Sequence, residues 1–264
     1  MIPLSFAQQR LWFLHRMEGR SATYNVPYAL RLNGKLDVAA LRRALDDVLA
    51  RHESLRTRIA GDQDEPRQLI VENKQVPWQH RKVEAERLVD ELREAAGQPF
   101  DLAREIPIRA WLFQTDAEEY VLLLLLHHIA VDGWSLGLLA RDMGQAYAAR
   151  CVGVAPAWAP LPVQYADYTL WQRELLGEGD DGSSVLARQR EYWLRQLAGL
   201  PDAIDLPADR RRPPVQSHRG DYLDVDRGRQ VRPERQSLGG TGRPARFRRV
   251  CDRPVRRRDR RDVR

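Results

Sequence analysis

Two adjacent histidines, His127 and His128, are followed at close spacing by Asp132 and Gly133 in this 264-residue chain. An imidazole can act as a general base toward an incoming nucleophile, and a nearby carboxylate can fix the local geometry. The amide of a glycine can approach a developing oxyanion closely. The four residues therefore favour acyl transfer. Two alternatives stay open at this point: a purely structural histidine pair, and a metal site formed by His127, His128 and Asp132.

The metal alternative is the weaker of the two. Neighbouring residues of a strand point to opposite faces, so the two imidazoles diverge and cannot share one ion. The chain also lacks a further ligand cluster such as HExxH. We therefore expect no metal, and we expect one histidine to face a cleft while the other packs beneath it.

The histidines follow an apolar run, Val121 to Leu126, that does not alternate. Such a run predicts a central strand buried on both faces of a sheet, and six residues are too few to span a membrane. After the turn at Asp132-Gly133, an amphipathic helix is predicted. Its apolar positions are Leu136, Leu139, Ala140, Met143 and Tyr147.

The other predicted elements indicate an α/β fold with a mixed central sheet flanked by helices. A hairpin at 116–119 beside crossover helices is the reason for expecting mixed pairing. Strands are predicted at 24–32, 55–59, 68–71 and 106–113, and helices at 5–17, 37–51, 85–96, 163–176 and 185–198. The aromatic residues Trp12, Phe13, Trp171, Tyr192 and Trp193 are predicted to pack in the core or at an interface.

Arg56 and Arg58 lie on one face of the strand predicted at 55–59. The simpler interpretation is a pair of solvated edge residues. The sharper one makes one of them the ion partner of Asp132, because a carboxylate beside an active imidazole needs a fixed counter-charge.

Charge and cysteine content limit the classes of function. Residues 227–264 carry fifteen arginines against four acidic residues, a net charge of +11, which leaves −5 for residues 1–226 out of +6 overall. Nucleic-acid binding could therefore rest on the tail only, and we rank it last. Two cysteines, Cys151 and Cys251, and the lack of a charged-then-apolar leader favour a reducing, cytoplasmic setting without a membrane segment.

Five motifs resemble the condensation domains of nonribosomal peptide synthetases, and the resemblance runs from Pro3 to about Asp226. They are SFAQQRLWFL (5–14), RHESLRT (51–57), PFDL (99–102), HHIAVDGWS (127–135, the HHxxxDG signature) and YADYTLW (165–171). The resemblance implies a chloramphenicol-acetyltransferase-like fold, of which residues 1–200 would be the N-terminal lobe. Residues 201–226 would be the inter-lobe connector, and the C-terminal lobe would be missing.

The resemblance also implies the chemistry: an amide bond forms between aminoacyl or peptidyl thioesters held on the phosphopantetheine arms of donor and acceptor peptidyl carrier protein domains. It makes His128 the catalytic histidine, as general base or as positioner, and Gly133 the residue whose amide faces the thioester. His127 and Asp132 would be structural, with Arg56 as the preferred counter-ion. No cofactor would be bound by the domain itself.

The resemblance leaves three questions open. The related epimerisation domain shares the HHxxxDG signature, although Trp134-Ser135 favours condensation. A non-catalytic remnant that docks a carrier protein is also possible, and a lobe alone is expected to be inactive. Finally, residues 227–264 are predicted to be disordered and to stem from a shifted reading frame of a G+C-rich gene, because the chain has 40 arginines but three lysines; a genuine basic arm is the alternative.

Overall fold

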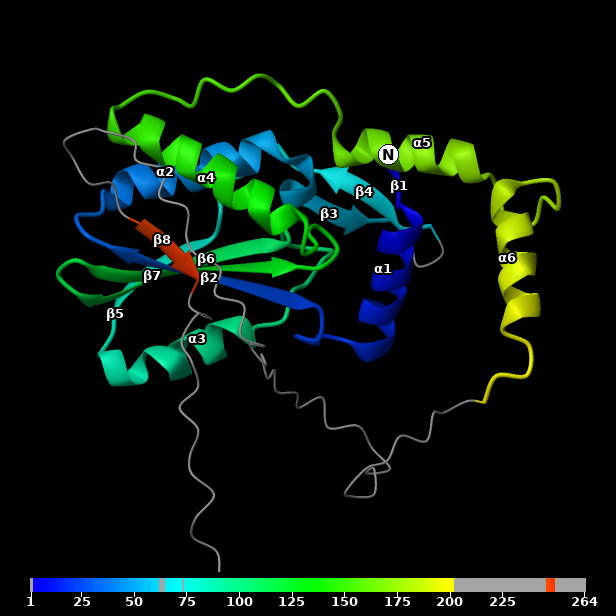
Figure 1. Ribbon diagram of the computed structural model, residues 1–264, viewed down its shortest axis with the longest axis horizontal. Helices are drawn as coiled ribbons and strands as arrows, with labels where there is room; N and C mark the ends of the chain where they lie inside the picture. Colours follow the sequence, from blue (N-terminus) through cyan, green and yellow to red (C-terminus); the bar gives the residue numbers. More distant parts are fainter. Residues whose placement is uncertain (1, 62–64, 73, 202–245, 250–264) are drawn as a thin grey trace, which may run out of the picture. The chain divides into compact units, whose positions relative to one another are not determined.

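The computed structural model describes residues 2–61, 65–72, 74–201 and 246–249. The chain divides into two compact units, one made of Met1–Leu175 with Pro244–Arg264 and the other of Leu176–Arg243. The first unit contains the sheets and most of the helices, and it holds all the predicted site residues (Figure 1).

A five-stranded sheet forms the centre of the first unit, in the order β5-β6-β7-β2-β8. β5 runs parallel to β6, and every other neighbouring pair is antiparallel, which confirms the predicted mixed sheet. The strands are β2 (Asn25–Asn33), β5 (Trp78–Lys82), β6 (Ile108–Asp116), β7 (Glu119–His127) and β8 (Arg246–Arg249).

Each face of β7 packs on a different pair of helices, as Figure 1 shows. Leu122, Leu124 and Leu126 belong to a core shared with α2 (Val38–Arg51) and α4 (Ser135–Cys151). The alternate residues of β7 face a second core, shared with α1 (Phe6–Glu18) and α3 (Leu88–Ala96). β7 is therefore the buried central strand that the apolar run predicts. Each of its leucines contributes roughly 1.5–3 kcal/mol by burial.

A small three-stranded sheet also belongs to the first unit. Its order is β1 (Ile2–Pro3), β4 (Arg67–Ile70) and β3 (Thr57–Ala60). The helix α5 (Tyr165–Leu176) is bound to this sheet by buried polar side chains, because the amide nitrogen of Gln68 donates to the Pro3 carbonyl (2.9 Å) and to the Thr169 hydroxyl (3.1 Å). Gln8 of α1 donates to the same glutamine (3.5 Å).

Several local predictions hold and others fail. The helices predicted at 5–17 and 37–51 are α1 and α2, which Ser5 and Asp37 cap. Phe13, in contrast, is 64% exposed instead of packed. The short strands β1, β5 and β8 are not predicted by the sequence. Four residues of the expected structureless tail form β8, because backbone pairing along the edge of β2 needs no apolar period.

The described part of the second unit holds one helix, α6 (Val185–Gln196), which Ser184 caps. Tyr192 and Trp193 on this helix, and Trp171 on α5, are exposed, so the core alternative is wrong for these three aromatics. The interface alternative stays a prediction. The predicted connector beyond residue 201, and the predicted tail apart from β8, lie outside the described residues.

Candidate active site

His127 and His128 lie where β7 ends, and they face opposite ways. His127 is 2% exposed, whereas His128 is exposed. Both backbones are held by the neighbouring strands: the His127 amide donates to the Pro107 carbonyl (3.1 Å), and the His128 amide donates to the Tyr24 carbonyl (2.9 Å). One imidazole is thus available to a substrate and the other belongs to the packing, as strand alternation predicts.

The His127 ring is enclosed by aromatic side chains. Phe100 meets it edge-on at 6.0 Å, His15 does so at 6.0 Å, and Tyr24 lies at 6.4 Å. Its Nδ1 accepts the Ile129 amide proton at 3.1 Å, so the ring is neutral and carries its proton on Nε2. Burial, together with the nearby His15 and His128, lowers the pKa of His127 to about 4. This ring is therefore hydrogen-bonded to the backbone that follows His128.

Stability should depend on the titration of His127. Between pH 6.5 and about 4 the unfolded chain binds a proton at this residue that the folded chain does not bind. The free energy of unfolding should therefore fall as the pH is lowered across this window, by up to about 3 kcal/mol from this group. Urea unfolding at a series of pH values will measure the slope. In His127→Asn, which keeps an acceptor but cannot titrate, the fall in the free energy of unfolding across this pH window should be smaller by this amount. An equal fall in the parent and in His127→Asn would contradict the assignment.

Asp132 and Ser135 close the loop that follows the histidines. The Asp132 carboxylate accepts from the Ser135 amide (2.8 Å) and from the Ser135 hydroxyl (2.6 Å), and the Asp132 amide donates back to that hydroxyl (3.3 Å). This reciprocal pair closes the loop just before α4, whose N-cap residue, Trp134, makes no side-chain cap hydrogen bond. These hydrogen bonds from Ser135 lower the pKa of Asp132. Gly133, between them, is exposed, and a Cβ there would meet no atom within 4 Å.

The structure does not bring Arg56 to Asp132. Arg56 ends a 3-10 helix (Glu53–Arg56) instead of lying in a strand, and its guanidinium contacts the Glu53 carboxylate (3.5 Å) and the Val71 carbonyl (3.3 Å). Arg58 of β3 donates to the Arg104 carbonyl (3.1 Å). The 3-10 turn rotates Arg56 toward the residue three positions before it, which is why the predicted ion pair with Asp132 is not formed among the described residues.

Asp132 should therefore contribute to stability through its hydrogen bonds with Ser135 in the loop before α4. Asp132→Ala should lower the free energy of unfolding by about 1 kcal/mol, the ordinary loss for such hydrogen bonds, and not by the larger amount expected of a buried ion pair. Thermal unfolding followed by circular dichroism will measure the difference. Because the folded-state pKa of Asp132 is depressed, its charge contributes above the ordinary carboxyl range and this contribution fades as the pH falls below it. A loss above roughly 3 kcal/mol would restore the ion-pair hypothesis.

Sequence reasoning missed a buried carboxylate, Asp142, which is 1% exposed on α4. It accepts from Arg51 Nε (3.0 Å), His52 Nε2 (2.9 Å) and Arg141 Nη2 (3.1 Å), and so connects α4 to the end of α2. Arg51 also donates to the Ala159 carbonyl (2.7 Å). The burial of Asp142 could have been predicted from the helical period, because Asp142 lies on the same face of α4 as the buried Leu139 and Met143.

Two other expectations concern metals and membranes. Across residues 2–61, 65–72, 74–201 and 246–249, no three His, Cys, Asp or Glu side chains gather in a way that could hold a metal ion. Within the same ranges, every helix is too short or too polar to cross a membrane.

Comparison with known sequences identifies close relatives. The family model of the condensation domain matches residues 1–238. CymA of Salinispora arenicola, described as a nonribosomal peptide synthetase, is 59% identical over 221 residues, which are 84% of this chain and 3% of that protein. A dimodular nonribosomal peptide synthase of Bacillus subtilis is 54% identical over 224 residues, 84% of this chain and 9% of that protein.

Solved structures show the same fold. The X-domain from teicoplanin biosynthesis is 41% identical with a TM-score of 0.74, over 82% of this chain and 48% of that one. The starter condensation domain of rhizomide synthetase, 21% identical with a TM-score of 0.64 over 76% of this chain and 48% of that one, shares the fold. The predicted chloramphenicol-acetyltransferase-like lobe is thus confirmed, and the chain spans about half of these solved chains and a small part of the synthetases. On this evidence of sequence and fold, the chain belongs to the condensation-domain family of nonribosomal peptide synthetases.

Proposed function

We propose that this lobe takes part in amide bond formation between two thioester-bound substrates, with His128 and Gly133 at the reacting centre. The observation that carries the proposal is the difference in burial between the two histidines at the end of β7. His128 and Gly133, five positions apart in the chain, are both exposed, while the buried His127 holds the backbone after His128 through the Ile129 amide. A purely structural histidine pair would not need one exposed member.

The proposed step balances as an acyl transfer. The amine of the acceptor substrate attacks the thioester carbonyl of the donor, so that a C–N bond forms, the C–S bond breaks and the thiol leaves. His128 accepts the proton of the amine or orients the amine by a hydrogen bond, and the Gly133 amide stabilises the oxyanion. Both substrates would be carried on phosphopantetheine arms of partner carrier domains.

The proposed reaction needs a second lobe, because the related solved chains are about twice as long as the part matched here. The decisive assay loads donor and acceptor carrier proteins with aminoacyl groups. It measures dipeptide formation by the 264-residue chain with and without a separately expressed second lobe from a close relative. Product formed only in the presence of both lobes would support the proposal. Absence of product with both lobes bound to each other would contradict it.

We also propose that the arginine-rich residues from 227 onward result from a shifted reading frame. The abundance of arginine over lysine supports this. The family match reaches residue 238, twelve residues beyond Asp226, which counts against a frame change as early as codon 227. The nucleotide sequence tests it: another frame should encode apolar-periodic helices of a second lobe, and the lack of an open alternative frame would refute it.

Gly133 provides a test that separates chemistry from folding. Because a Cβ at Gly133 would meet only open space, Gly133→Ala should melt like the parent. In the two-lobe assay it should reduce amide formation by about 100-fold, the order expected when a reacting group is displaced by roughly 1 Å. Gly137→Ala is the matched control, because Gly137 is also exposed with open space around it. Equal activity of the two variants would exclude Gly133 from the reacting centre.

A binding function is the second candidate, and one comparison favours it. The teicoplanin X-domain, 40% identical to this chain with a TM-score of 0.76, has been solved in a complex with OxyB, so a related domain serves as a docking partner. If this chain is a docking module, it should bind carrier proteins in titrations and form no amide in any combination of lobes. His128→Ala would then leave binding unchanged.

A further inference from the structure

Beneath the candidate site, the turn that connects α3 to β6 carries a buried phenylalanine. Phe100 is 1% exposed, and its ring lies edge-on to the His127 ring at 6.0 Å. Because His127 in turn holds the Ile129 amide, the position of Phe100 bears directly on the backbone that presents His128. The question is what holds Phe100 in place.

Arg109, near the start of β6, lies over the ring of Phe100. Its guanidinium carbon lies 4.5 Å from the centre of the phenylalanine ring, and its side chain is 15% exposed. Arg109 also donates to the carbonyl of Pro99 (3.0 Å), the residue just before Phe100. A cation over a ring face is attractive, and more so where water is largely excluded.

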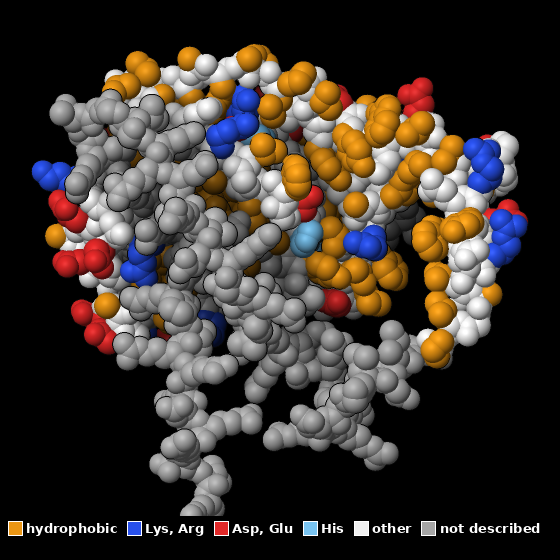
Figure 2. Space-filling model, viewed as in Figure 1, with side chains coloured by type: hydrophobic (Ala, Val, Ile, Leu, Met, Phe, Trp, Pro, Cys, Tyr) orange, Lys and Arg blue, Asp and Glu red, His pale blue; other side chains and the backbone are white. Residues whose placement is uncertain are grey.

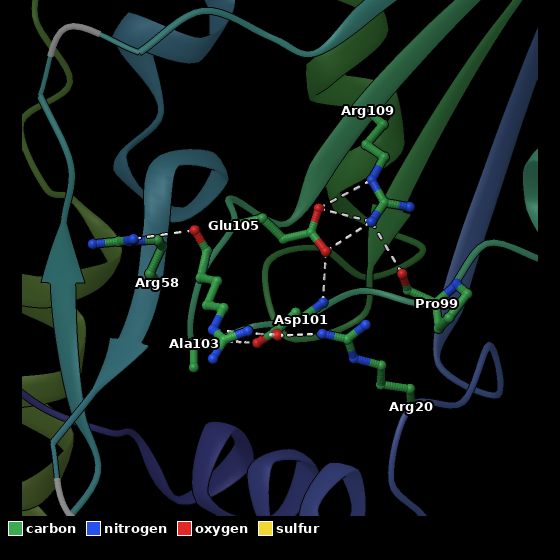
Figure 3. Close-up of polar contacts among 8 residues, drawn as sticks. Arg20, Arg58, Pro99, Asp101, Ala103, Glu105 and Arg109 are labelled. Carbon is green, nitrogen blue, oxygen red and sulfur yellow. Dashed lines mark hydrogen bonds and ion pairs between the residues drawn. The ribbon is translucent and has the colours of Figure 1, made fainter.

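Glu105 holds the Arg109 guanidinium by an ion pair, as Figure 3 shows. Its carboxylate accepts from Arg109 Nε (3.1 Å) and from Nη2 (2.7 Å to each oxygen), and it also accepts from the Asp101 amide (2.6 Å). The guanidinium plane is therefore fixed by a forked ion pair, and the backbone is held at Pro99 and Asp101, on both sides of Phe100. The turn is further tied to the chain after α1 by Arg20, which contacts the Asp101 carboxylate at 2.7 Å.

We propose that Arg109 and Glu105 are positioning residues for His128, acting through Phe100 and His127. In this series of contacts, the Glu105 carboxylate holds the Arg109 guanidinium, which lies over the Phe100 ring. The Phe100 ring contacts the His127 imidazole, and the imidazole accepts the Ile129 amide proton. The assignment to catalysis rests on the proposed function, whereas the contacts that transmit it are independent of any reaction. Neither residue belongs to a motif that the sequence analysis singled out.

Nuclear magnetic resonance of the full 264-residue chain tests the proposal without any assay of amide formation. Two signals matter: the protonation pattern of the His127 ring nitrogens and the hydrogen exchange of the Ile129 amide, expressed relative to the amide of Leu124 in β7. Arg109→Met should accelerate the relative exchange of Ile129 at least tenfold and remove the single tautomer at His127. Arg109→Lys, which keeps the charge but not the fork, should fall between the parent and Arg109→Met.

Arg150→Met is the stability-matched control. It breaks another forked pair, Arg150 with Asp47 (2.6 and 2.7 Å), whose side chains are 23% and 16% exposed and which joins α4 to α2. Arg150→Met should change the hydrogen exchange rates of the Ile129 and Leu124 amides by one common factor, so that their ratio stays the same. If Arg109→Met fails to fold, Arg109→Lys and Phe100→Leu take its place with the same expected direction. A relative Ile129 exchange that stays unchanged in the folded variants, or that changes as much in Arg150→Met, would overturn the proposal. In the two-lobe assay Arg109→Lys should lower kcat and leave KM unchanged.

Discussion

Replacing His128 by alanine in the two-lobe protein is expected to reduce the rate of amide formation by about 10²–10⁴-fold, the usual contribution of a positioned acid or base. The side chain is exposed and makes no side-chain hydrogen bond within residues 2–61, 65–72, 74–201 and 246–249, so stability should change by less than about 0.5 kcal/mol. Single-turnover measurements with preloaded carrier proteins will isolate the chemical step, because they remove product release from the observed rate.

His127→Ala is the informative counterpart of His128→Ala. It should lower both stability and activity, since it removes a buried ring from between Phe100 and His15 and frees the Ile129 amide. His128→Gln adds a second control, because glutamine can hydrogen bond to the substrate but cannot take a proton at neutral pH. Substantial activity in His128→Gln would favour the positioning role over the general-base role. Full activity in His128→Ala would exclude His128 from both.

The largest loss of stability is expected for Asp142→Ala. The substitution leaves the largely buried Arg51 and its neighbour His52 without the carboxylate that compensates them. Removing one partner of a buried ion pair typically costs about 3–5 kcal/mol. Urea unfolding of the full chain at pH 7 will measure this cost. A loss no larger than that of Asp132→Ala would mean that water solvates the cluster.

The pH dependence gives the Asp142 prediction a second check. Burial pushes the pKa of Asp142 upward, but hydrogen bonds from His52, Arg141 and Arg51 outweigh burial, and the folded-state pKa is lowered. The contribution of Asp142 is therefore fully present above the ordinary carboxyl pKa and is lost as the pH falls through the lower folded value. The difference between parent and Asp142→Ala should accordingly stay constant near neutrality and narrow only in strong acid.

The sequence predicts the elements whose signal is local. The uninterrupted run in β7 and the starts of α1 and α2 depend on neighbours within a few residues, and the structure has these elements where they are predicted. The opposite orientations of His127 and His128 follow from the two-residue period of a strand, which makes them equally predictable. The family and its fold were accessible for the same reason, because the motifs are continuous in the chain.

Contacts between distant segments were not predictable in this way. The wrong assignment of Arg56 arose because a 3-10 turn and a strand cannot be told apart over four residues of RHESLRT, yet they direct the side chain differently. The exposed Phe13 and Trp171 look like core residues in composition, and only the packing around them shows otherwise. Figure 2 shows hydrophobic side chains gathered over α5 and around α1, a distribution that no periodicity in the sequence reports.

The polar contacts that join α5 to the beginning of the chain also determine when this lobe can fold during synthesis. Ser5 bonds to Tyr165 (2.9 Å), and Arg173 donates to the Leu4 carbonyl (2.8 Å), so partners roughly 160 residues apart must meet. Contacts of such separation form late, because the entropy of closing the intervening loop is lost before they are gained. On the ribosome, α1 therefore has to wait until α5 has emerged from the exit tunnel. The first helix to be synthesised should be among the last to acquire its final contacts.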